Sequence, residues 1–347
     1  MSRWGKFKRA GVFKPDQASK LEITQLQIQA NQVNYSSRPK LIAVVGTTAT
    51  GKTPLGVELA LELGGEVVNA DSRLFYRGMD VATAKPTKDE TKGIPHHLID
   101  FLAPDDQYSL AEYLKKARSA ISEILDRGNL PILVGGSGQY VWAIIEGWNV
   151  PEIQPNPSLR SQLECEFARD GIEPLAKQLL EISPTTAETT DLRNPRRVIR
   201  AIERVRSGSV DPTYTPSKST HSPFDHYIVG LMIERAVLHA RIVERLDSMD
   251  KNGWRQEVES LLHQGYSTKD HALSAIGYPQ MIDHLNGESD LTEAIRLTSV
   301  ATNRLIRRQN NWFKQNDKRI KWFDMTHEPQ QKTQSIISAV GQWYDLK

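Results

Sequence analysis

The chain has 347 residues, 39% of them hydrophobic, which is enough to form two globular units or one unit with a large insertion. No apolar run approaches the roughly eighteen residues of a membrane-spanning helix, and the single cysteine, Cys165, excludes an intramolecular disulfide framework and a thiolate zinc cluster. The formal charge of +2 is uneven, because residues 1–40 hold eight Lys and Arg against two Asp and Glu. We expect a cytoplasmic protein with a basic, disordered N-terminal arm at 1–39; the alternative for this basic, acid-poor leader is a transit peptide.

From Lys40 onward, short apolar runs alternate with helical periods. The predicted buried strands are LIAVV (41–45), EVVNA (66–70), LPILV (130–134), YIVGLMI (227–233) and RIKWF (319–323). Strands separated by helices pair in parallel, so we predict an α/β fold with a parallel sheet. A capping box, Ser109 with Glu112, begins one covering helix, and Gly128 ends it.

The character of the chain changes between residues 151 and 223. This stretch has two predicted helices, no strand-like run, and linkers rich in Pro and Ser at both ends. We therefore divide the chain into the arm, a first core segment at 40–150, a helical insertion at 151–223, and a second core segment with C-terminal helices at 224–347.

Residues 46–53, GTTATGKT, match the phosphate-binding P-loop pattern G-x-x-x-x-G-K-[ST] between a predicted strand and a predicted helix. In such a loop, backbone amides converge on phosphate oxygens, the lysine supplies positive charge, and the final hydroxyl can bind Mg²⁺. The predicted phosphate-binding residues are Gly46, Thr47, Thr48, Ala49, Thr50, Gly51, Lys52 and Thr53, with Thr53 as the magnesium ligand.

An ordinary nucleoside triphosphatase or kinase site is incomplete here. No acidic residue follows LPILV, where GGSGQY stands instead. The second predicted strand is followed by Asp71, at the sheet edge where open α/β folds bind ligands. That carboxylate can bind Mg²⁺ or act as a base. The pair His96 and His97 has no third ligand at suitable spacing, so we interpret it as structural.

Seven motifs in a fixed order resemble the tRNA dimethylallyltransferases, also called tRNA isopentenyltransferases of the IPP transferase family. They are GTTATGKT, DSRLFYRGMDVATAKP (71–86), PHHLID (95–100), GGSGQY (135–140), RNPRRVIRAIE (193–203), SAIGYPQM (274–281) and TNRLIRRQNNWF (302–313). The resemblance, from about Leu41 to Phe323, implies a P-loop NTPase-like core with an inserted helical domain. It also implies transfer of a dimethylallyl group from dimethylallyl diphosphate to N6 of the adenosine 3′ of the anticodon in tRNA, with Mg²⁺. A monomer suffices for this reaction, so we expect a monomer.

The resemblance also implies roles for particular side chains. Asp71 matches the family's catalytic base, and the Ser137 hydroxyl matches a threonine expected near that base and the nucleotide. The P-loop amides, Lys52 and Thr53 would stabilise the departing diphosphate. Arg235 is a further candidate for a diphosphate contact.

The tRNA-contact segments of the family map onto five parts of this chain. They are Asp71, Ser72, Arg73 and Leu74; Ser137; Arg160; Arg196, Arg197, Val198, Ile199 and Arg200; and Ala275, Ile276, Gly277, Tyr278, Pro279 and Gln280. Arg307 and Arg308 are expected along RNA phosphates. Trp312 and Phe313, at helical spacing, are predicted to be core residues.

The chain departs from the family pattern at a few positions. Thr47 replaces a P-loop proline, Leu74 replaces a glutamine near the nucleotide, Ala82 replaces a glycine, and Pro279 stands where a charged residue is common. Pro54, directly after the P-loop, cannot offer a backbone amide to a nucleotide α-phosphate, which favours a diphosphate ligand over a triphosphate.

Three alternatives stay open at this point. A P-loop small-molecule kinase would consume ATP and would not need the arginine-rich insertion. An adenylate isopentenyltransferase would prenylate a free nucleotide with the same P-loop and Asp71. An RNA-binding protein with a vestigial P-loop would not need the intact Lys52, Thr53 and Asp71 that this chain has.

Overall fold

The computed structural model describes residues 38–152, 156–208 and 221–345. The chain divides into two compact units, residues 1–39 and 40–347, and all the elements named here belong to the second. The predicted basic arm lies outside the described residues, apart from its last two. In the described part of the chain, no helix is long and apolar enough to cross a membrane.

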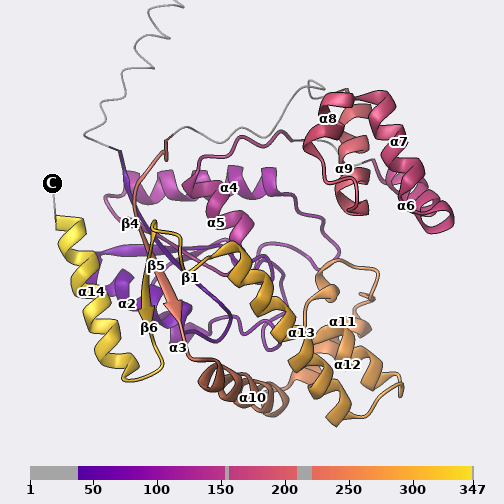
Figure 1. Cartoon of the computed structure of the whole chain (residues 1–347). Helices are drawn as coiled ribbons and strands as arrows, with labels where there is room; N and C mark the ends of the chain where they lie inside the picture. Colours follow the sequence, from indigo (N-terminus) through magenta and orange to yellow (C-terminus); the bar gives the residue numbers. More distant parts are fainter. Residues whose placement is uncertain (1–37, 153–155, 209–220, 346–347) are drawn as a thin grey trace, which may run out of the picture. The chain divides into compact units, whose positions relative to one another are not determined.

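A six-stranded parallel sheet forms the centre of the second unit (Figure 1). Its strands are β1 (Lys40–Gly46), β2 (Gly65–Asn69), β3 (His96–His97), β4 (Leu130–Val134), β5 (Asp225–Met232) and β6 (Ile320–Asp324), in the order β3-β2-β4-β1-β5-β6. The parallel α/β prediction is confirmed, with five strands within two residues of their predicted bounds. The two-residue β3 was not predicted, because it is too short to produce an apolar run.

Helices cover both faces of this sheet. Alternate residues of β1 enter different cores: Leu41, Ala43 and Val45 in one, Ile42 and Val44 in the other. The second core is closed by α2 (Lys52–Leu63) and α14 (Pro329–Asp345), which lie side by side in Figure 1. The first includes α4 (Leu110–Asp126), α5 (Gly138–Ile145), α10 (Arg235–Lys251), α11 (Trp254–His263), α12 (Tyr278–Leu285) and α13 (Leu291–Trp312).

The sequence predicted the start of α4 correctly. Ser109 and Glu112 form the expected capping box, in which the serine hydroxyl accepts from the Glu112 amide and the Glu112 carboxylate accepts from the Ser109 amide. The helix ends at Asp126, two residues before Gly128, which has a left-handed φ of 76°.

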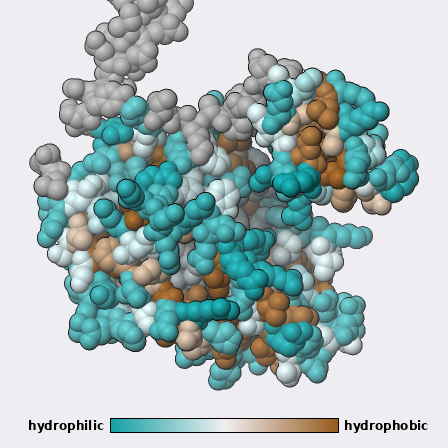
Figure 2. Space-filling model, viewed as in Figure 1, coloured by the Kyte–Doolittle hydropathy of each residue, from teal (hydrophilic) through white to brown (hydrophobic). Residues whose placement is uncertain are grey.

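The described residues of the insertion form four helices rather than the two predicted. They are α6 (Pro157–Asp170), α7 (Glu173–Ile182), α8 (Pro184–Thr189) and α9 (Pro195–Arg206). The divisions follow from Asn156, Ser183 and Asn194, whose side chains cap α6, α8 and α9, each with a proline as the first helical residue. The insertion has its own apolar cluster, and Figure 2 shows apolar side chains at its surface.

Candidate functional site

The P-loop lies at the carboxyl end of β1, between that strand and α2. Its backbone needs glycine at both ends, because Gly46 and Gly51 have φ angles of 146° and 90°. The Thr47 carbonyl closes the loop by accepting from the Thr50 hydroxyl at 2.8 Å and from Lys52 Nζ at 2.7 Å. Burial lowers the pKa of Lys52 to about 8. The predicted phosphate-binding loop is therefore formed, with its lysine held inside it.

Two arginines of α10 contact this loop. Arg245 Nη1 donates to the Thr48 hydroxyl at 3.0 Å, and Arg241 Nη1 donates to the Ala49 carbonyl at 3.4 Å. Arg235, the predicted diphosphate contact, is the exposed first residue of the same helix, and none of the described residues hydrogen-bonds its side chain. The other two arginines could have been found from the sequence, because positions four apart share one face of a helix.

Asp71 begins the loop after β2, as predicted. Its backbone is held by Asn69, whose Oδ1 accepts from the Asp71 amide and whose Nδ2 donates to the Asp71 carbonyl, both at 2.9 Å. Asp71 Oδ1 accepts from the Arg73 amide at 3.0 Å. The negative charge of Asp71 opposes the burial that lowers the pKa values of Lys52 and Arg245. Asp71 thus lies within electrostatic reach of the phosphate-binding loop.

The glycine-rich turn after β4 lies against the Asp71 loop. Gly135 is required there, because a Cβ atom would stand 2.2 Å from the Ala70 carbonyl oxygen. The Ser137 amide donates to that same carbonyl at 3.2 Å, and the Ser137 hydroxyl accepts from the Ser72 amide at 3.3 Å. The structure therefore joins Ser137 to the Asp71 loop.

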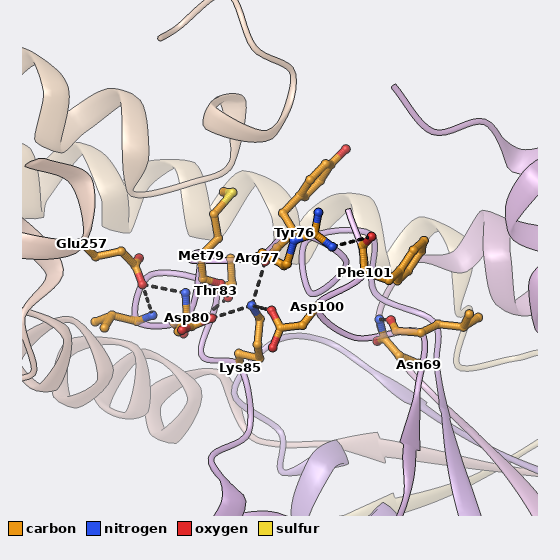
Figure 3. Close-up of polar contacts among 12 residues, drawn as sticks. Asn69, Tyr76, Arg77, Met79, Asp80, Thr83, Lys85, Asp100, Phe101 and Glu257 are labelled. Atoms are coloured by element: carbon orange, nitrogen blue, oxygen red, sulfur yellow. Dashed lines mark hydrogen bonds and ion pairs between the residues drawn. The ribbon is translucent and has the colours of Figure 1, made fainter. Parts of the chain in front are cut away.

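Residues 76–85 continue the Asp71 loop and are held in place by two side chains whose roles the sequence did not predict, Lys85 and Glu257 (Figure 3). The buried Lys85 amine bonds Asp80, Asp100 and the Tyr76 carbonyl. The Glu257 carboxylate accepts from the amides of three consecutive residues, Asp80 and Val81 at 2.6 Å and Ala82 at 3.2 Å. No sequence pattern links Glu257 to this loop, because 175 or more residues separate them.

The segment 275–280 also contacts Glu257. Tyr278 is fully buried, and its hydroxyl donates to Glu257 Oε1 at 2.7 Å. Gly277 has a φ of 102°. A Cβ atom added to Gly277 would stand 3.1 Å from the Ala82 Cβ, so Ala82, which replaces the family glycine, packs against a residue that has no side chain. Of the six predicted tRNA contacts here, Ala275 and Tyr278 have buried side chains, whereas Ile276, Pro279 and Gln280 are partly exposed.

Arginines dominate the predicted tRNA contacts on the insertion. Arg196 and Arg197 are exposed at the start of α9. Arg160 and Arg200 both form ion pairs with Glu203: Arg160 Nη1 lies 3.9 Å from Oε1, and Arg200 Nη1 lies 3.2 Å from Oε2. The remaining predicted residues of this segment, Val198 and Ile199, face the insertion's apolar cluster, so their side chains are not available to RNA.

A basic cavity lies beside segment 275–280. Its volume is about 450 Å³, and it is lined by Ile276, Ala301, Arg304, Arg307 and Arg308. This places the predicted phosphate contacts Arg307 and Arg308 on one surface with Ile276. Arg304, one turn earlier on α13, was not predicted.

The C-terminal end of α13 corrects one sequence prediction. Phe313 is buried, as expected, but Trp312 is 44% exposed. Trp312 packs against Gly138: a Cβ atom added to Gly138 would stand 2.3 Å from the Trp312 Cβ. The Trp312 carbonyl accepts from Trp142 Nε1 at 3.1 Å. Helical spacing placed both aromatics in the core, whereas the helix ends at Trp312 and the chain turns there.

The histidine pair forms the two-residue edge strand β3. His97 Nε2 lies 2.6 Å from Glu66 Oε2, and the Glu66 carboxylate also binds Arg127 and Asn129. The hydrogen bond from Arg127 is the largest cause lowering the pKa of Glu66 to about 2. Within the described ranges, no group of three or more His, Cys, Asp or Glu side chains could hold a metal.

The fold and this site define a class of protein. A P-loop at the end of β1, with a carboxylate after β2 and two arginines of α10 against the loop, is characteristic of α/β proteins that bind phosphorylated ligands. The sequence profile of the IPP transferase family matches residues 74–316. The chain therefore belongs to the IPP transferase family.

Individual relatives agree with this placement. The chain is 43% identical over 291 residues to the tRNA dimethylallyltransferase of Thermomicrobium roseum, covering 84% of this chain and 88% of the relative. It is 40% identical over 288 residues to the tRNA dimethylallyltransferase of Pelotomaculum thermopropionicum, covering 83% of this chain and 91% of that protein.

Solved structures have the same fold. The full-length tRNA isopentenylpyrophosphate transferase of Bacillus halodurans is 38% identical, with a TM-score of 0.65, over 88% of this chain and 96% of its own. A eukaryotic dimethylallyltransferase acting on tRNA is 25% identical, with a TM-score of 0.73, over 87% of this chain and 78% of that chain. The predicted resemblance and fold class are confirmed.

Proposed function

We propose that the protein transfers a dimethylallyl group from dimethylallyl diphosphate to N6 of the adenosine 3′ of the anticodon in tRNA. The observation that carries this proposal is the placement of Asp71 beside a phosphate-binding loop whose lysine it influences electrostatically. The relatives named tRNA dimethylallyltransferase support tRNA as the acceptor over a free nucleotide. We further propose that the protein acts in the cytoplasm and as a monomer.

The acceptor amine needs a base. The lone pair of the adenine N6 amine is delocalised into the ring, so removal of a proton as the C–N bond forms helps the attack. In the proposed step, N6 bonds to the allylic carbon, Asp71 takes the N6 proton, and the bond from carbon to the diphosphate oxygen breaks. Ser137, next to this loop, is proposed to hold the nucleotide.

The leaving group needs positive charge. Diphosphate departs with the bonding electron pair. The P-loop amides other than that of Thr48, which donates to Gln309, are proposed to stabilise it together with Lys52 and Arg245. Arg245 is added to the residues predicted from sequence because its guanidinium contacts Thr48 in the loop. Arg235 stays a candidate from the sequence.

The site fits a magnesium ion bound mainly by substrate. Magnesium commonly binds proteins through one or two oxygen ligands together with substrate phosphates. Thr53, the second residue of α2, offers the hydroxyl, and the described residues form no closed metal cage. We propose that Thr53 holds Mg²⁺, which when bound neutralises part of the diphosphate charge.

The tRNA surface is proposed to comprise three parts. They are the Asp71 loop with Arg73, the insertion arginines Arg196 and Arg197, and the basic cavity of α13. Reaching N6 requires the base to leave the anticodon-loop stack, which favours a protein that holds the loop by phosphate contacts around a narrow site.

One assay tests the proposal against its alternatives. The protein is incubated with labelled dimethylallyl diphosphate, Mg²⁺ and either unmodified tRNA or AMP. We expect label on the tRNA alone. Label on AMP would identify a free-nucleotide prenyltransferase, and ATP consumption without prenyl transfer would identify a kinase.

A further inference from the structure

The buried amide of Gln309 lies between the P-loop and the glycine-rich turn. Gln309 belongs to α13 and is 5% exposed. Its Oε1 accepts from the Thr48 amide at 2.9 Å, and its Nε2 donates to the Gly136 carbonyl at 3.3 Å. A backbone amide only donates and a carbonyl only accepts, so the two partners fix the orientation of the side-chain amide.

These two partners belong to opposite sides of the proposed reaction. Thr48 is part of the loop that would hold the diphosphate. Gly136 immediately precedes Ser137, whose hydroxyl accepts from Ser72 beside Asp71. One side chain therefore joins the donor-binding loop to the loops that would receive the adenine.

The contact leaves no space for adjustment. A Cβ atom on Gly136 would stand 2.2 Å from Gln309 Nε2. One turn further along α13, Trp312 packs on Gly138 of the same turn and accepts from Trp142 Nε1. The end of α13 is thus held against the glycine-rich turn by Gln309 and by Trp312. Of these two residues, Gln309 also contacts the P-loop.

We propose that Gln309 is a positioning residue for the transfer, setting the separation between the diphosphate-binding loop and the acceptor loops. The inference rests on the proposed function. Displacing reacting groups by about 1 Å can cost on the order of 100-fold in rate, because the atoms no longer meet at bonding distance. The Gln309 side chain hydrogen-bonds Thr48 and Gly136, not Asp71 or Lys52, so its effect comes through loop placement.

The test uses Gln309→Met in the full chain, which keeps the length and approximate volume of the side chain and removes both hydrogen bonds. We expect the single-turnover rate of tRNA prenylation, with both substrates saturating, to fall by about 10-fold to 100-fold. The KM of each substrate should stay within about 3-fold of wild type, because the residues proposed to bind them are unchanged.

Two further variants make the result decisive. Thr298→Val alters another buried, hydrogen-bonded side chain of α13 away from both loops, and its single-turnover rate should stay within about 2-fold of wild type. Gln309→Asn keeps the amide on a shorter side chain that cannot reach both partners, so it should lose rate in the same step. If Gln309→Met does not fold, this second variant carries the test.

A Gln309 variant that reacts at the wild-type single-turnover rate, or that loses activity only through KM, overturns the inference while leaving the proposed function intact. An equal loss in Thr298→Val also overturns it, because the effect would then be general to the helix. Failure of the wild-type protein to prenylate tRNA overturns the proposed function itself.

Discussion

Arg245 Nη1 lies 3.0 Å from Thr48 Oγ1, so a guanidinium of α10 faces the phosphate-binding loop. Burial lowers the pKa of Arg245, yet an arginine keeps its charge at any physiological pH. A partly buried cation at this position is suited to a diphosphate.

We expect Arg245→Ala to lower kcat/KM for dimethylallyl diphosphate by about 100-fold, because charge-assisted contacts to a leaving group strengthen as it departs. Arg235→Ala is the matched control on the same helix, and steady-state kinetics should give a change within about 3-fold. A larger loss for Arg235→Ala would favour the assignment made from sequence.

The lowered pKa of Lys52 predicts the pH dependence of donor binding. Burial lowers this pKa from 10.5 to about 8, so the amine is charged below that pH and neutral above it. Diphosphate favours the charged amine, so its affinity should be constant below about pH 7.5 and fall, by up to about tenfold per pH unit, above pH 8. Calorimetry in buffers of different ionisation heat should show proton uptake at pH 8.5.

Lys52→Arg is the control, because an arginine stays charged through this range and should remove the step near pH 8. Lys52 affects the stability of the ligand-free protein in the opposite direction, because this stability rises with pH whereas the affinity for diphosphate falls. The unfolded chain binds more protons than the folded one between pH 8 and 10.5, so Lys52 makes the ligand-free protein more stable as pH rises through this window. A step in affinity that persists in Lys52→Arg would contradict the assignment.

Asp71→Asn separates binding from chemistry. The asparagine keeps an Oδ1 that can accept from the Arg73 amide, so the loop should hold its shape. We expect tRNA affinity, measured by filter binding, to stay within about 3-fold, whereas the prenylation rate should fall by at least about 100-fold because the base is lost. An active Asp71→Asn protein would remove Asp71 from its proposed role.

The sequence predicted those parts of the site that are local in the chain. The P-loop, Asp71 and the turn containing Ser137 each follow a strand, and parallel strands bring their carboxyl ends to one edge, so motif and strand order together placed them. The covering helix after Ser109 was predicted for the same reason, because its cap lies within four residues.

The parts that escaped prediction depend on contacts distant in sequence. Glu257 and Val81 are hydrogen-bonded although 176 residues separate them, and Gln309 and Thr48 although 261 separate them. Neither a glutamate nor a glutamine indicates such a partner in the sequence. Helical periodicity predicts Trp312 in the core because it does not show where a helix ends. The pattern predicts two helices for the insertion, although the Asn-Pro and Ser-Pro caps of three of the four described helices are visible in the sequence.

Glu257→Ala tests the anchor of loop 80–82. The carboxylate accepts from three backbone amides, and hydrogen bonds to a charged group contribute about 1.5–3 kcal/mol each, part of which water would replace. We expect the free energy of unfolding in urea to fall by about 2 kcal/mol. Glu259→Ala, on the same helix, removes only an exposed ion pair with Arg255 and should cost less than about 1 kcal/mol. Equal losses would show that Glu257 is no anchor.

Pro54 predicts which phosphate chain the loop prefers. The Leu55 amide donates to the Gly51 carbonyl and Lys52 begins α2, so the missing N–H of Pro54 costs no helical hydrogen bond and removes one donor at the loop. Competition binding should therefore show dimethylallyl diphosphate binding more tightly than ATP. Pro54→Ala restores the amide and should tighten ATP by about 3-fold to 10-fold, the value of one hydrogen bond, while leaving the diphosphate within about 2-fold. Tighter binding of ATP to the wild-type protein would mean that the loop is built for a nucleotide after all.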